Sequence, residues 1–280
     1  MAEIHVFKHH AMATYFEARI SGEEKSYAEG AAQNAFALLD RLENHLSRFR
    51  ASSDISRIAQ LSPGEKLRVS EPAFACLEIG KKMEHATRGA FSVAPAALKS
   101  QPAAPRWILL KEMLSIRCES GKLEFDLGAI GKGFALDRMA RELQEWDCPS
   151  FLLVAGGSSI LAGAPPEGLP GWSSGLGDDN AEHRYWLKHC SLSGSGVAVK
   201  GEHIFDPRTG KPARQRSRAW ALASSGAESD ALSTACMVLS ESEIAEVAEQ
   251  SEDWLVLLND GRHWIHYGRR ESPCLVTESR

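Results

Sequence analysis

The sequence predicts an α+β protein, in which short and largely antiparallel strands form mixed sheets with helices packed against them. Residues 26–49 carry apolar side chains at the three- and four-residue spacing of a helix face. Residues 150–163 indicate a buried strand, a double-glycine turn and a second strand. Residues 253–268 indicate a hairpin, with Asn-Asp-Gly as its turn signal.

The N-terminal part of the chain is predicted to contain both kinds of element. Residues 14–20 alternate well enough to form a strand. The apolar face of the helix that follows consists of Ala35, Leu38, Leu39, Leu42, Leu46 and Phe49. Residues 50–70 are polar and rich in turn formers, and either Ser53 or Asp54 is a candidate cap for a short helix there. Another helix is expected over residues 71–87.

Residues 88–107 interrupt this pattern with a stretch that is rich in Ala and Pro. The stretch is a candidate hinge between two lobes, but the segments on either side do not differ enough in composition to define two domains. A chain of 280 residues is long enough for a large core. We therefore predict one large domain over residues 1–280, with a division into two lobes left open.

The second half of the chain is predicted to begin with a strand, a glycine loop and a helix, at residues 121–128, 129–133 and 134–146. Further strands are expected at residues 171–177, 184–194, 202–206 and 217–224. A helix is expected over residues 229–250, ahead of the C-terminal hairpin.

Composition and charge exclude several classes of protein. A net charge of −5 provides no general attraction to nucleic acid or anionic membranes. The six cysteines are scattered without a C-x-x-C pair, and neither they nor the histidines predict a transition-metal site. No run approaches the roughly 18 apolar residues of a membrane span, and no signal peptide or lipid-acceptor cysteine opens the chain. As written, the sequence predicts a soluble cytoplasmic protein, or a periplasmic one if a leader has been removed.

Residues 126–137, DLGAIGKGFALD, set a glycine-rich loop ahead of an expected helix. Backbone N–H groups and the positive end of a helix macrodipole both suit an anion, and Lys132 adds a cation. Two nucleotide-binding fingerprints do not fit, because a P-loop requires glycine at position 126 and the dinucleotide pattern G-x-G-x-x-G fails at Leu136. A phosphate cradle and an ordinary strand–helix turn both remain open.

Residues 228–235, ESDALSTA, place Asp230 and Thr234 four positions apart, so that they share one face of a helix. A carboxylate and a hydroxyl in that arrangement offer two hard oxygen ligands to Mg²⁺, which keeps other positions for water and substrate phosphate. The alternative is an aspartate that stabilises the helix N-terminus, with the threonine merely beside it. This stretch by itself favours the alternative.

Three turns complete the set of candidate segments. Gly156 and Gly157 permit close approach of a flat ligand, or they simply make a tight hairpin. Residues 193–196, SGSG, are either a concavity of N–H groups for an anion or a flexible loop. Residues 203–212, HIFDPRTGKP, surround a Pro-Gly turn with an imidazole, a carboxylate and a hydroxyl. Taken alone, this last segment is best interpreted as a turn.

In this order, the segments resemble the FAD:protein FMN transferase family, known as ApbE. DLGAIGKGFALDR, GGSSILAG, SGSG, HIFDPRTGKP and SDALSTA follow one another as the family's DLGGIAKGYAVD-like loop, GGD-like turn, T-S-G loop, H-I-x-D-P-x-T-G and A-D-A-L-S-T-A. AMAT at residues 11–14 is similar to the family's M-G-T, and residues 46–58 are similar to its L-S-x-[FY]-x-x-x-S-[DE]-[IL]-S. The HIFDPRTG and DALSTA blocks are the most specific parts of the resemblance.

The resemblance implies an ApbE-like fold and an enzyme that handles FAD. Members of the family bind FAD with Mg²⁺ and transfer its FMN half to a Thr or Ser hydroxyl of an acceptor flavoprotein, releasing AMP. The chemical task is phosphoryl-type transfer, which requires neutralising charge, holding the pyrophosphate in line and deprotonating a hydroxyl.

The resemblance also implies roles for individual residues. Asp230, Thr234 and the main-chain carbonyl of Gly131 match the family's metal site, while His203, Asp206 and Asp230 are the implied catalytic residues. His203 is expected to contact the pyrophosphate or accept a proton, because a histidine is neutral and basic near its ordinary pKa of about 6.5. The implied cofactor-binding residues are Met12, Asp126, Gly131, Lys132, Gly156, Gly157, Ser158, Ser193, Gly194, His203 and Thr209.

Four departures from the family pattern keep other functions open. Ser158 stands where the GGD turn has its carboxylate, Ser92 replaces the aspartate after Gly-Ala-Phe, and Ala13 replaces the glycine of M-G-T. The loop from SGSG to His203 also lacks the family's usual acidic and aromatic residues. The alternatives are an FAD pyrophosphatase that releases FMN and AMP, and a non-catalytic FAD-binding protein with a partly degenerate site.

Overall fold

A long antiparallel sheet carries most of the molecule in the computed structural model, which describes residues 3–94, 105–176, 184–196, 204–259, 264–268 and 275–277. Its strand order is β1-β2-β6-β7-β10-β11-β12-β13, and every neighbouring pair is antiparallel. These strands are β1 (Ile4–Ala11), β2 (Thr14–Ser21), β6 (Phe151–Ala155), β7 (Ser159–Ala162), β10 (Cys190–Gly196), β11 (Arg218–Ala223), β12 (Leu255–Asn259) and β13 (Trp264–Gly268).

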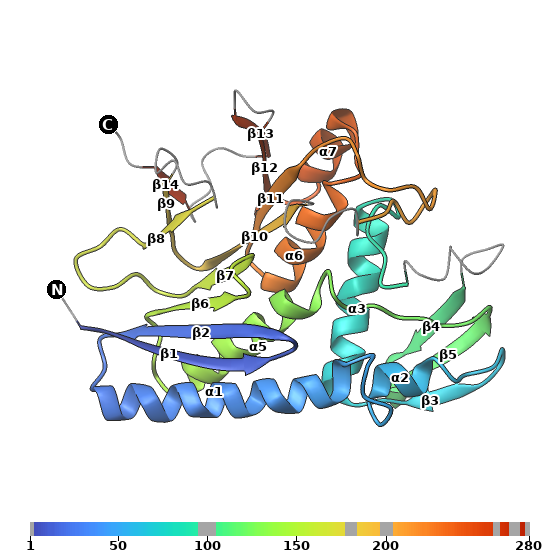
Figure 1. The fold of residues 1–280 in the computed structure, drawn as a ribbon, viewed down its shortest axis with the longest axis horizontal. Coiled ribbons are helices and arrows are strands. Elements are labelled where there is room, and N and C mark those ends of the chain that lie inside the picture. Colours follow the sequence, from blue (N-terminus) through green and yellow to red (C-terminus); the bar gives the residue numbers. More distant parts are fainter. Residues whose placement is uncertain are drawn as a thin grey trace.

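Two smaller antiparallel sheets flank the long one (Figure 1). One has the order β3-β5-β4 and the other the order β14-β9-β8. Their strands are β3 (Lys66–Arg68), β4 (Arg106–Leu110), β5 (Ser115–Ser120), β8 (Trp172–Gly175), β9 (Arg184–Leu187) and β14 (Leu275–Thr277). The α+β class with largely antiparallel sheets is therefore confirmed.

Helices pack against the long sheet and against one another. Figure 1 shows α1 running along the β1–β2 hairpin, while α5 contacts both α1 and α6. The helices are α1 (Lys25–Leu46), α2 (Asp54–Ile58), α3 (Glu71–Ala86), α5 (Gly131–Glu145), α6 (Gly226–Ala235), α7 (Glu241–Ala248) and the 3-10 helix η1 (Lys111–Met113).

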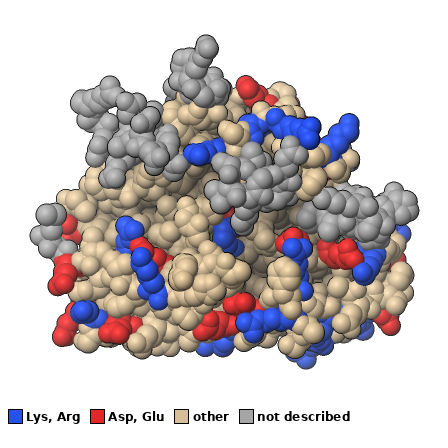
Figure 2. Space-filling model, viewed as in Figure 1, with Lys and Arg blue, Asp and Glu red and all other residues tan. Residues whose placement is uncertain are grey.

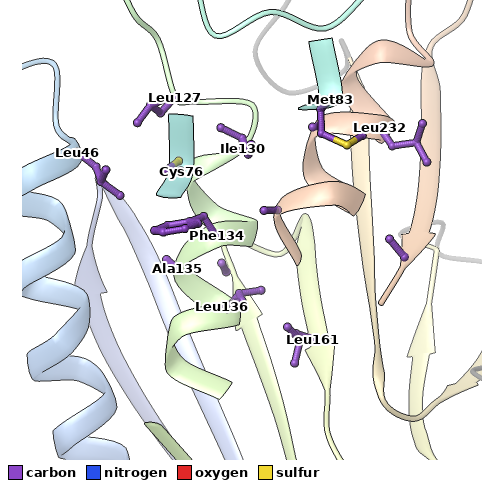
Figure 3. Close-up of a cluster of buried hydrophobic side chains, with 14 of the residues drawn as sticks. Leu46, Cys76, Met83, Leu127, Ile130, Phe134, Ala135, Leu136, Leu161 and Leu232 are labelled. Carbon is purple, nitrogen blue, oxygen red and sulfur yellow. The ribbon is translucent and has the colours of Figure 1, made fainter. Parts of the chain in front are cut away.

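The main core lies where α3, α5 and α6 meet the sheet. Phe134 and Leu136 of α5, Leu161 of β7, Leu232 of α6 and Met83 of α3 are buried in one cluster (Figure 3). Complete burial of each such side chain contributes about 2 kcal/mol to the stability of the fold. The α5–α6 pair is thus held in place by packing, and this pair carries the candidate site described below.

Local signals correctly predicted most of the elements. Strand β2, helices α1 and α3, the β6–β7 hairpin and the β12–β13 pairing all lie where the sequence predicts them. Of the two candidate caps of α2, Ser53 is the one used, since its hydroxyl accepts the N–H of Ser56. Strands β1 and β14 and all three strands of the β3-β5-β4 sheet were not predicted. Residues 95–104, in the candidate hinge, lie outside the described residues.

The strand predicted at residues 121–128 is wrong. Leu123, Phe125 and Leu127 are buried in alternation, as the pattern requires, but this segment joins no sheet among the described residues. It has no regular secondary structure, and the Asp126 N–H donates to the Val93 carbonyl at 2.7 Å. The alternation of apolar and polar residues correctly predicted which side chains are buried, but burial does not require pairing with another strand.

Two longer predictions are divided by the structure. Residues 184–194 form β9 and β10, separated at His189, whose φ of 49° turns the chain. Residues 229–250 fall into α6 and α7, because Ser240 starts a new helix with a reciprocal capping box to Glu243. Of the strand predicted at 202–206, the described part makes only an isolated bridge from Phe205 to Pro212.

The apolar face predicted for the first helix also needs one correction. Helix α1 ends at Leu46, so Phe49 lies beyond it and is 84% exposed. The cause is local: the cap residue Ser47 has extended backbone angles, and Ser47 and Arg50 accept hydrogen bonds that close the turns after it.

Charged side chains of both signs are interspersed over the face drawn in Figure 2. Many are paired, as in Arg19–Glu17 at 2.6 Å and Arg138–Glu71 at 2.6 Å. Within the part of the chain that the structure describes, none of the helices combines the length and the apolar character needed to cross a membrane.

Candidate functional site

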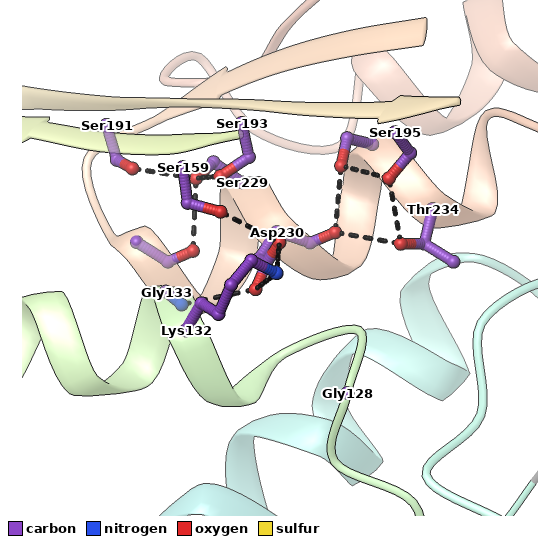
Figure 4. Close-up of polar contacts among 12 residues, drawn as sticks. Gly128, Lys132, Gly133, Ser159, Ser191, Ser193, Ser195, Ser229, Asp230 and Thr234 are labelled. Atoms are coloured by element: carbon purple, nitrogen blue, oxygen red, sulfur yellow. Dashed lines mark hydrogen bonds and ion pairs between the residues drawn. The ribbon is translucent and has the colours of Figure 1, made fainter. Parts of the chain in front are cut away.

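Asp230 lies inside α6 and only 2% of its surface is exposed. The helix begins four residues earlier, at Gly226, and its cap is Ser225, whose hydroxyl accepts the N–H of Glu228. Asp230 is therefore not the terminal stabiliser that the sequence left open. Its carboxylate accepts the Ser159 hydroxyl at 3.2 Å and the Gly133 N–H at 3.1 Å (Figure 4).

Lys132, in the first turn of α5, reaches the same carboxylate. Its ammonium lies 3.2 Å from one Asp230 oxygen and 3.3 Å from the other. Only 23% of the lysine side chain and 3% of the aspartate side chain are exposed. The lysine-bearing segment in mid-chain and the late helix thus meet at one buried carboxylate.

Hydroxyl groups from β10 and α6 continue the polar cluster beside Asp230. The Thr234 hydroxyl lies one turn further along α6, donates to the Asp230 main-chain carbonyl at 3.2 Å and lies 3.1 Å from the Ser195 hydroxyl. The predicted sharing of one helix face by Asp230 and Thr234 is found. Since a hydroxyl has one proton and two lone pairs, Thr234 keeps capacity to accept or to ligate.

Helices α5 and α6 approach each other through glycines. A Cβ on Gly133 would lie 1.9 Å from the Gly226 carbonyl oxygen, so only glycine fits there. The Asp137 carboxylate, one turn along α5, accepts the N–H groups of Gly226 at 2.6 Å and Ala227 at 2.9 Å and the Ser225 hydroxyl at 2.8 Å. Burial raises the pKa of Asp137, and the hydrogen bonds to α6 oppose that rise.

The loop before α5 is tied to the segment after α1. Asp126 accepts the Gly128 N–H at 2.9 Å and pairs with the Arg48 guanidinium at 3.0 Å. That guanidinium also lies 4.8 Å from the centre of the exposed Phe49 ring. Gly131 is the first residue of α5 and adjoins Lys132, and no side chain caps this helix at Ile130. An exposed aromatic ring and an arginine therefore flank the glycine loop.

The glycine turn between β6 and β7 adjoins two other predicted segments. Gly156, with a φ of 58°, donates its N–H to the Tyr15 carbonyl at 2.9 Å, beside the β1–β2 turn. Gly157 has a φ of 69°. The Ser158 carbonyl accepts the Gly194 N–H at 2.7 Å.

Strand β10 and the β1–β2 turn supply the neighbouring positions. Ser193 pairs with Ser159 across β10 and β7, and its hydroxyl bonds to Ser229 at 2.9 Å. Met12, in the β1–β2 turn, donates its N–H to Glu43 at 2.9 Å. Met12, Gly156 and Ser158 thus lie on neighbouring turns, whereas Ser193 and Gly194 lie within strand β10. The SGSG segment is therefore neither the flexible loop nor the N–H concavity that the sequence left open, because its four residues pair with β11 and Ser193 also pairs with β7.

The described part of HIFDPRTGKP is a tightly bonded turn. The Asp206 carboxylate accepts the main-chain N–H of Arg208 at 2.9 Å. The Arg208 guanidinium also donates to each of the two Asp206 oxygens at 3.0 Å. Thr209 accepts the Lys211 N–H at 3.3 Å, and Gly210 has a φ of 69°. These contacts assign Asp206 and Thr209 to the turn itself, so the catalytic role predicted for Asp206 has no support in its geometry. His203 lies outside the described residues.

The oxygen donors at Asp230 suit Mg²⁺, which keeps water and phosphate ligands, better than a metal ion whose ligands are all protein side chains. Among the described residues, no three His, Cys, Asp or Glu side chains gather as a metal site. The Asp230 carboxylate and the Thr234 hydroxyl are hard oxygen donors, and Mg²⁺ commonly completes its shell with water and substrate phosphates. The Lys132 ammonium on the carboxylate also shows that this position accepts a cation.

The family model described as the ApbE family matches residues 12–258. The chain belongs to the ApbE family. A FAD:protein FMN transferase from Klebsiella pneumoniae is 26% identical over 222 residues, covering 67% of this chain and 68% of the relative. Another from Vibrio cholerae is 24% identical over 251 residues, covering 77% of this chain and 75% of the relative. The resemblance inferred from sequence motifs is confirmed.

Solved ApbE structures share the fold. The flavin transferase ApbE from Vibrio cholerae has a TM-score of 0.79 at 21% identity, covering 96% of this chain and 98% of that one. The apo flavinyl transferase ApbE from Pseudomonas stutzeri has a TM-score of 0.79 at 19% identity, covering 96% and 95%. At these identities the likeness establishes the ApbE fold and not the activity.

The structure bears on two departures from the ApbE motifs. Ala13 replaces the glycine of M-G-T at a φ of 57°, in a two-residue turn with Met12 at 50°; this positive φ accounts for the family's glycine, and nothing in the structure explains the alanine. Ser92 replaces an aspartate, but Glu84 of α3 hydrogen-bonds to it, so a carboxyl group still lies there. Burial raises the pKa of Glu84. No contact of the Ser158 side chain accounts for the lost carboxylate in the GGD turn.

Sequence reasoning assigned no role to three residues that contact this site. Ser159 donates a hydrogen bond to Asp230, and Asp137 accepts one from Gly226 at the start of α6. Arg48 is paired with Asp126. Asp137 and Arg48 stand inside ApbE-like blocks, which is a signal that could have found them. Ser159 also stands inside such a block, GGSSILAG, but its contact with Asp230 depends on a sheet register and a distant helix.

Proposed function

We propose that this chain is a FAD:protein FMN transferase, the name that its ApbE relatives carry, and that its reaction depends on Mg²⁺. The observation that carries the proposal is the convergence of Lys132 and Asp230 beside a glycine loop at a helix N-terminus. The continuous core, which includes Ala11 at one end of the chain and Leu258 near the other, supports a single domain as the acting unit.

Asp230, Thr234 and the Gly131 carbonyl are the proposed metal ligands. Mg²⁺ bound there supplies positive charge against the phosphate oxygens of FAD. Asp230 is oriented by Ser159 and the Gly133 N–H, and its low exposure limits competition from water. A rigid ligand in a shielded site binds a hard cation more effectively than a mobile one.

Lys132 and the start of α5 are proposed to hold the pyrophosphate. The Lys132 ammonium pairs with Asp230 at 3.2 Å, and Ile130, the residue before α5, supplies no side-chain cap; the first turn of α5 also has no acidic residue. The positive end of the α5 dipole favours an anionic ligand, while the Gly131 and Gly133 N–H groups already donate to the Leu127 carbonyl and the Asp230 carboxylate. Phe49 and Arg48, at the rim of the same loop, are suitably placed to contact a planar ring.

In the proposed reaction, a Thr or Ser hydroxyl of the acceptor protein attacks the FMN phosphorus. A new oxygen–phosphorus bond forms, the bond to the bridging oxygen breaks and AMP leaves. The hydroxyl proton passes to a base, for which His203 remains the candidate on sequence grounds. Unchanged transfer by a His203→Ala variant would exclude that role.

The test incubates the chain with FAD and Mg²⁺, with and without an acceptor bearing a D-x-x-[ST]-G-A-T-like segment. AMP formed only with acceptor, together with in-gel flavin fluorescence of the acceptor, is the expected result. AMP with free FMN would indicate a pyrophosphatase, and absence of both products would indicate binding alone.

Asp230→Asn is the informative variant for this assay. We expect a loss of transfer of at least about 100-fold, because the neutral amide removes the metal-binding charge. Glu228→Gln is the matched control on the same helix, since Glu228 bonds Lys82 at 2.6 Å and the Trp254 ring N–H at 3.0 Å, away from Lys132. Equal losses in both variants would assign the effect to folding of α6.

A further inference from the structure

We propose that Ser159 is a positioning residue that orients the Asp230 carboxylate toward the divalent cation. The inference deepens the proposed function, because it rests on a metal site at Asp230. Ser159 opens β7, is fully buried and donates its hydroxyl to Asp230 Oδ1 at 3.2 Å (Figure 4). The adjoining part of the ApbE motif does not prescribe a serine at this position.

The carboxylate is held through both oxygens by donors from different elements. Ser159 on β7 occupies Oδ1, and the Gly133 N–H on α5 occupies Oδ2 at 3.1 Å. A carboxylate bonded through each oxygen to a fixed neutral donor cannot rotate about its own axis without breaking one of these bonds. Both donors are buried, so water does not readily replace them.

The third partner of the carboxylate is a charged one. The Lys132 ammonium contacts both oxygens and ends a flexible side chain. The two neutral donors therefore leave the remaining lone pairs of the Asp230 carboxylate directed to the side where the Lys132 ammonium lies. In this arrangement Ser159 and Gly133 set the orientation, while Lys132 marks the side from which positive charge is received.

The register of the sheet fixes Ser159 in this role. Ser159 pairs with Ser193 on β10, and the hydroxyls of Ser191, Ser193 and Ser229 bond among themselves at 2.8–2.9 Å. Ser191 also donates to the Ile160 carbonyl at 2.7 Å. Of these buried serines, Ser159 is the one with a hydrogen bond to the Asp230 carboxylate, and Ser191 supplies a control of equal burial in the same layer.

Removal of the Ser159 hydroxyl should weaken the metal site more than the fold. Partners that orient a metal ligand typically change metal affinity by about 10-fold or more when they are lost. We expect Ser159→Ala to lower the affinity for Mn²⁺ about tenfold. Ser159→Cys, which keeps the size but donates weakly, should lower it by a similar factor, and Ser159→Thr should retain most of it.

The experiment measures Mn²⁺ binding by the loss of the free-ion electron paramagnetic resonance signal. ADP is present at one concentration throughout as a diphosphate without flavin, and ADP without protein is the blank. Thermal unfolding of each variant establishes that it is folded; if Ser159→Ala does not fold, the comparison is made with Ser159→Cys. Ser191→Ala should bind Mn²⁺ as tightly as the unchanged chain.

Each outcome bears on the inference. Weaker Mn²⁺ binding in Ser159→Ala or Ser159→Cys, with normal binding in Ser191→Ala and Ser159→Thr, supports it. Equal affinities in all variants, or equal losses at Ser159 and Ser191, overturn it. Because no FMN transfer is measured, these results are independent of the acceptor; absence of Mn²⁺ binding in the unchanged chain would overturn the metal site and the inference together.

Discussion

Lys132 and Asp230 form a buried ion pair across 98 positions of sequence, with the ammonium 3.2 Å from one carboxylate oxygen and 3.3 Å from the other. The pair joins the first turn of α5 to the interior of α6. It places the positive charge where the proposed function requires a divalent cation, so lysine and metal compete for, or share, one carboxylate.

Lys132→Met should therefore make stability depend on Mg²⁺. Without metal, the variant is expected to lose about 2 kcal/mol, since a buried carboxylate loses its charged partner. Mg²⁺ should raise the melting temperature of the variant more than that of the unchanged chain, because the cation replaces the ammonium. Thermal unfolding with and without Mg²⁺ measures both effects.

Lys82→Met is the control for this prediction. Lys82, on α3, pairs with Glu228 of α6, the helix that carries Asp230. Because 65% of the Lys82 side chain is exposed, its loss should change the stability little with or without Mg²⁺. An identical Mg²⁺ response in Lys132→Met and the unchanged chain would contradict the prediction.

Gly133→Ala and Gly131→Ala should have opposite effects on stability. Alanine is favoured over glycine in a helix by about 1 kcal/mol, and both residues lie in α5. At Gly131 the added Cβ meets only the Leu127 Cβ at 3.7 Å, so a gain of up to about 1 kcal/mol is expected. At Gly133 it would lie 1.9 Å from the Gly226 carbonyl oxygen, and a loss of about 3 kcal/mol or more is expected.

Urea unfolding of the two glycine variants provides the comparison. Equal stabilities would show that α5 and α6 can separate at this point without cost. That result would remove the physical reason for a glycine at position 133.

Glu243 should make stability depend on pH in the acid range. Its carboxylate accepts the Ser240 N–H at 2.8 Å and the Arg208 guanidinium at 2.7 Å, and these bonds, led by that from the Ser240 backbone, lower its pKa from 4.5 to about 2. A lowered pKa in the folded state stabilises the fold above the unfolded value. This contribution is lost as the pH falls from 4.5 toward about 2.

Glu243→Gln tests this dependence. The variant should be less stable by about 1 kcal/mol at neutral pH, as expected for loss of a helix-capping partner, and the difference should shrink below pH 4.5. Glu246→Gln breaks an ion pair with Arg88 in which both side chains are more than half exposed. This variant should show a smaller change in stability. A constant difference between Glu243→Gln and the unchanged chain across this range would refute the assignment.

Phe49→Ala should weaken FAD binding without destabilising the fold. The ring is 84% exposed, so its removal creates no cavity, but it lies at the glycine loop through the Arg48–Asp126 pair. Loss of a stacking contact of about 1 kcal/mol corresponds to roughly fivefold weaker binding. Quenching of FAD fluorescence measures the affinity.

Tyr27→Ala provides the control for the aromatic variant. Tyr27 is 43% exposed and lies near the opposite end of α1, where its hydroxyl bonds to the Trp146 carbonyl at 3.0 Å. FAD affinity should be unchanged in this variant. If Phe49→Ala also retains full affinity, the ring does not contact the flavin.

Several site positions could be recognised from sequence because their signals are local. Asp230 and Thr234 share a helix face through a spacing of four, and Ser53 caps α2 through its preference for the N-cap. The ApbE motifs also marked both Lys132 and Asp230 as site residues, and the two form an ion pair. Phe49 was misjudged, because apolar periodicity does not reveal where a helix stops.

The sequence by itself determined the periodic helices, the hairpins and the capping residues, because each depends on side chains within one or two turns of the chain. Only the tertiary structure decided three outcomes: residues 121–128 have no partner strand in the described part of the chain, the Arg208 guanidinium pairs with the Asp206 carboxylate, and Ser159 bonds to Asp230. Those outcomes depend on sheet register and on the close packing of α5 against α6 at Gly133. Contacts over such sequence distances arise from burial of the core as a whole, and no short segment encodes them.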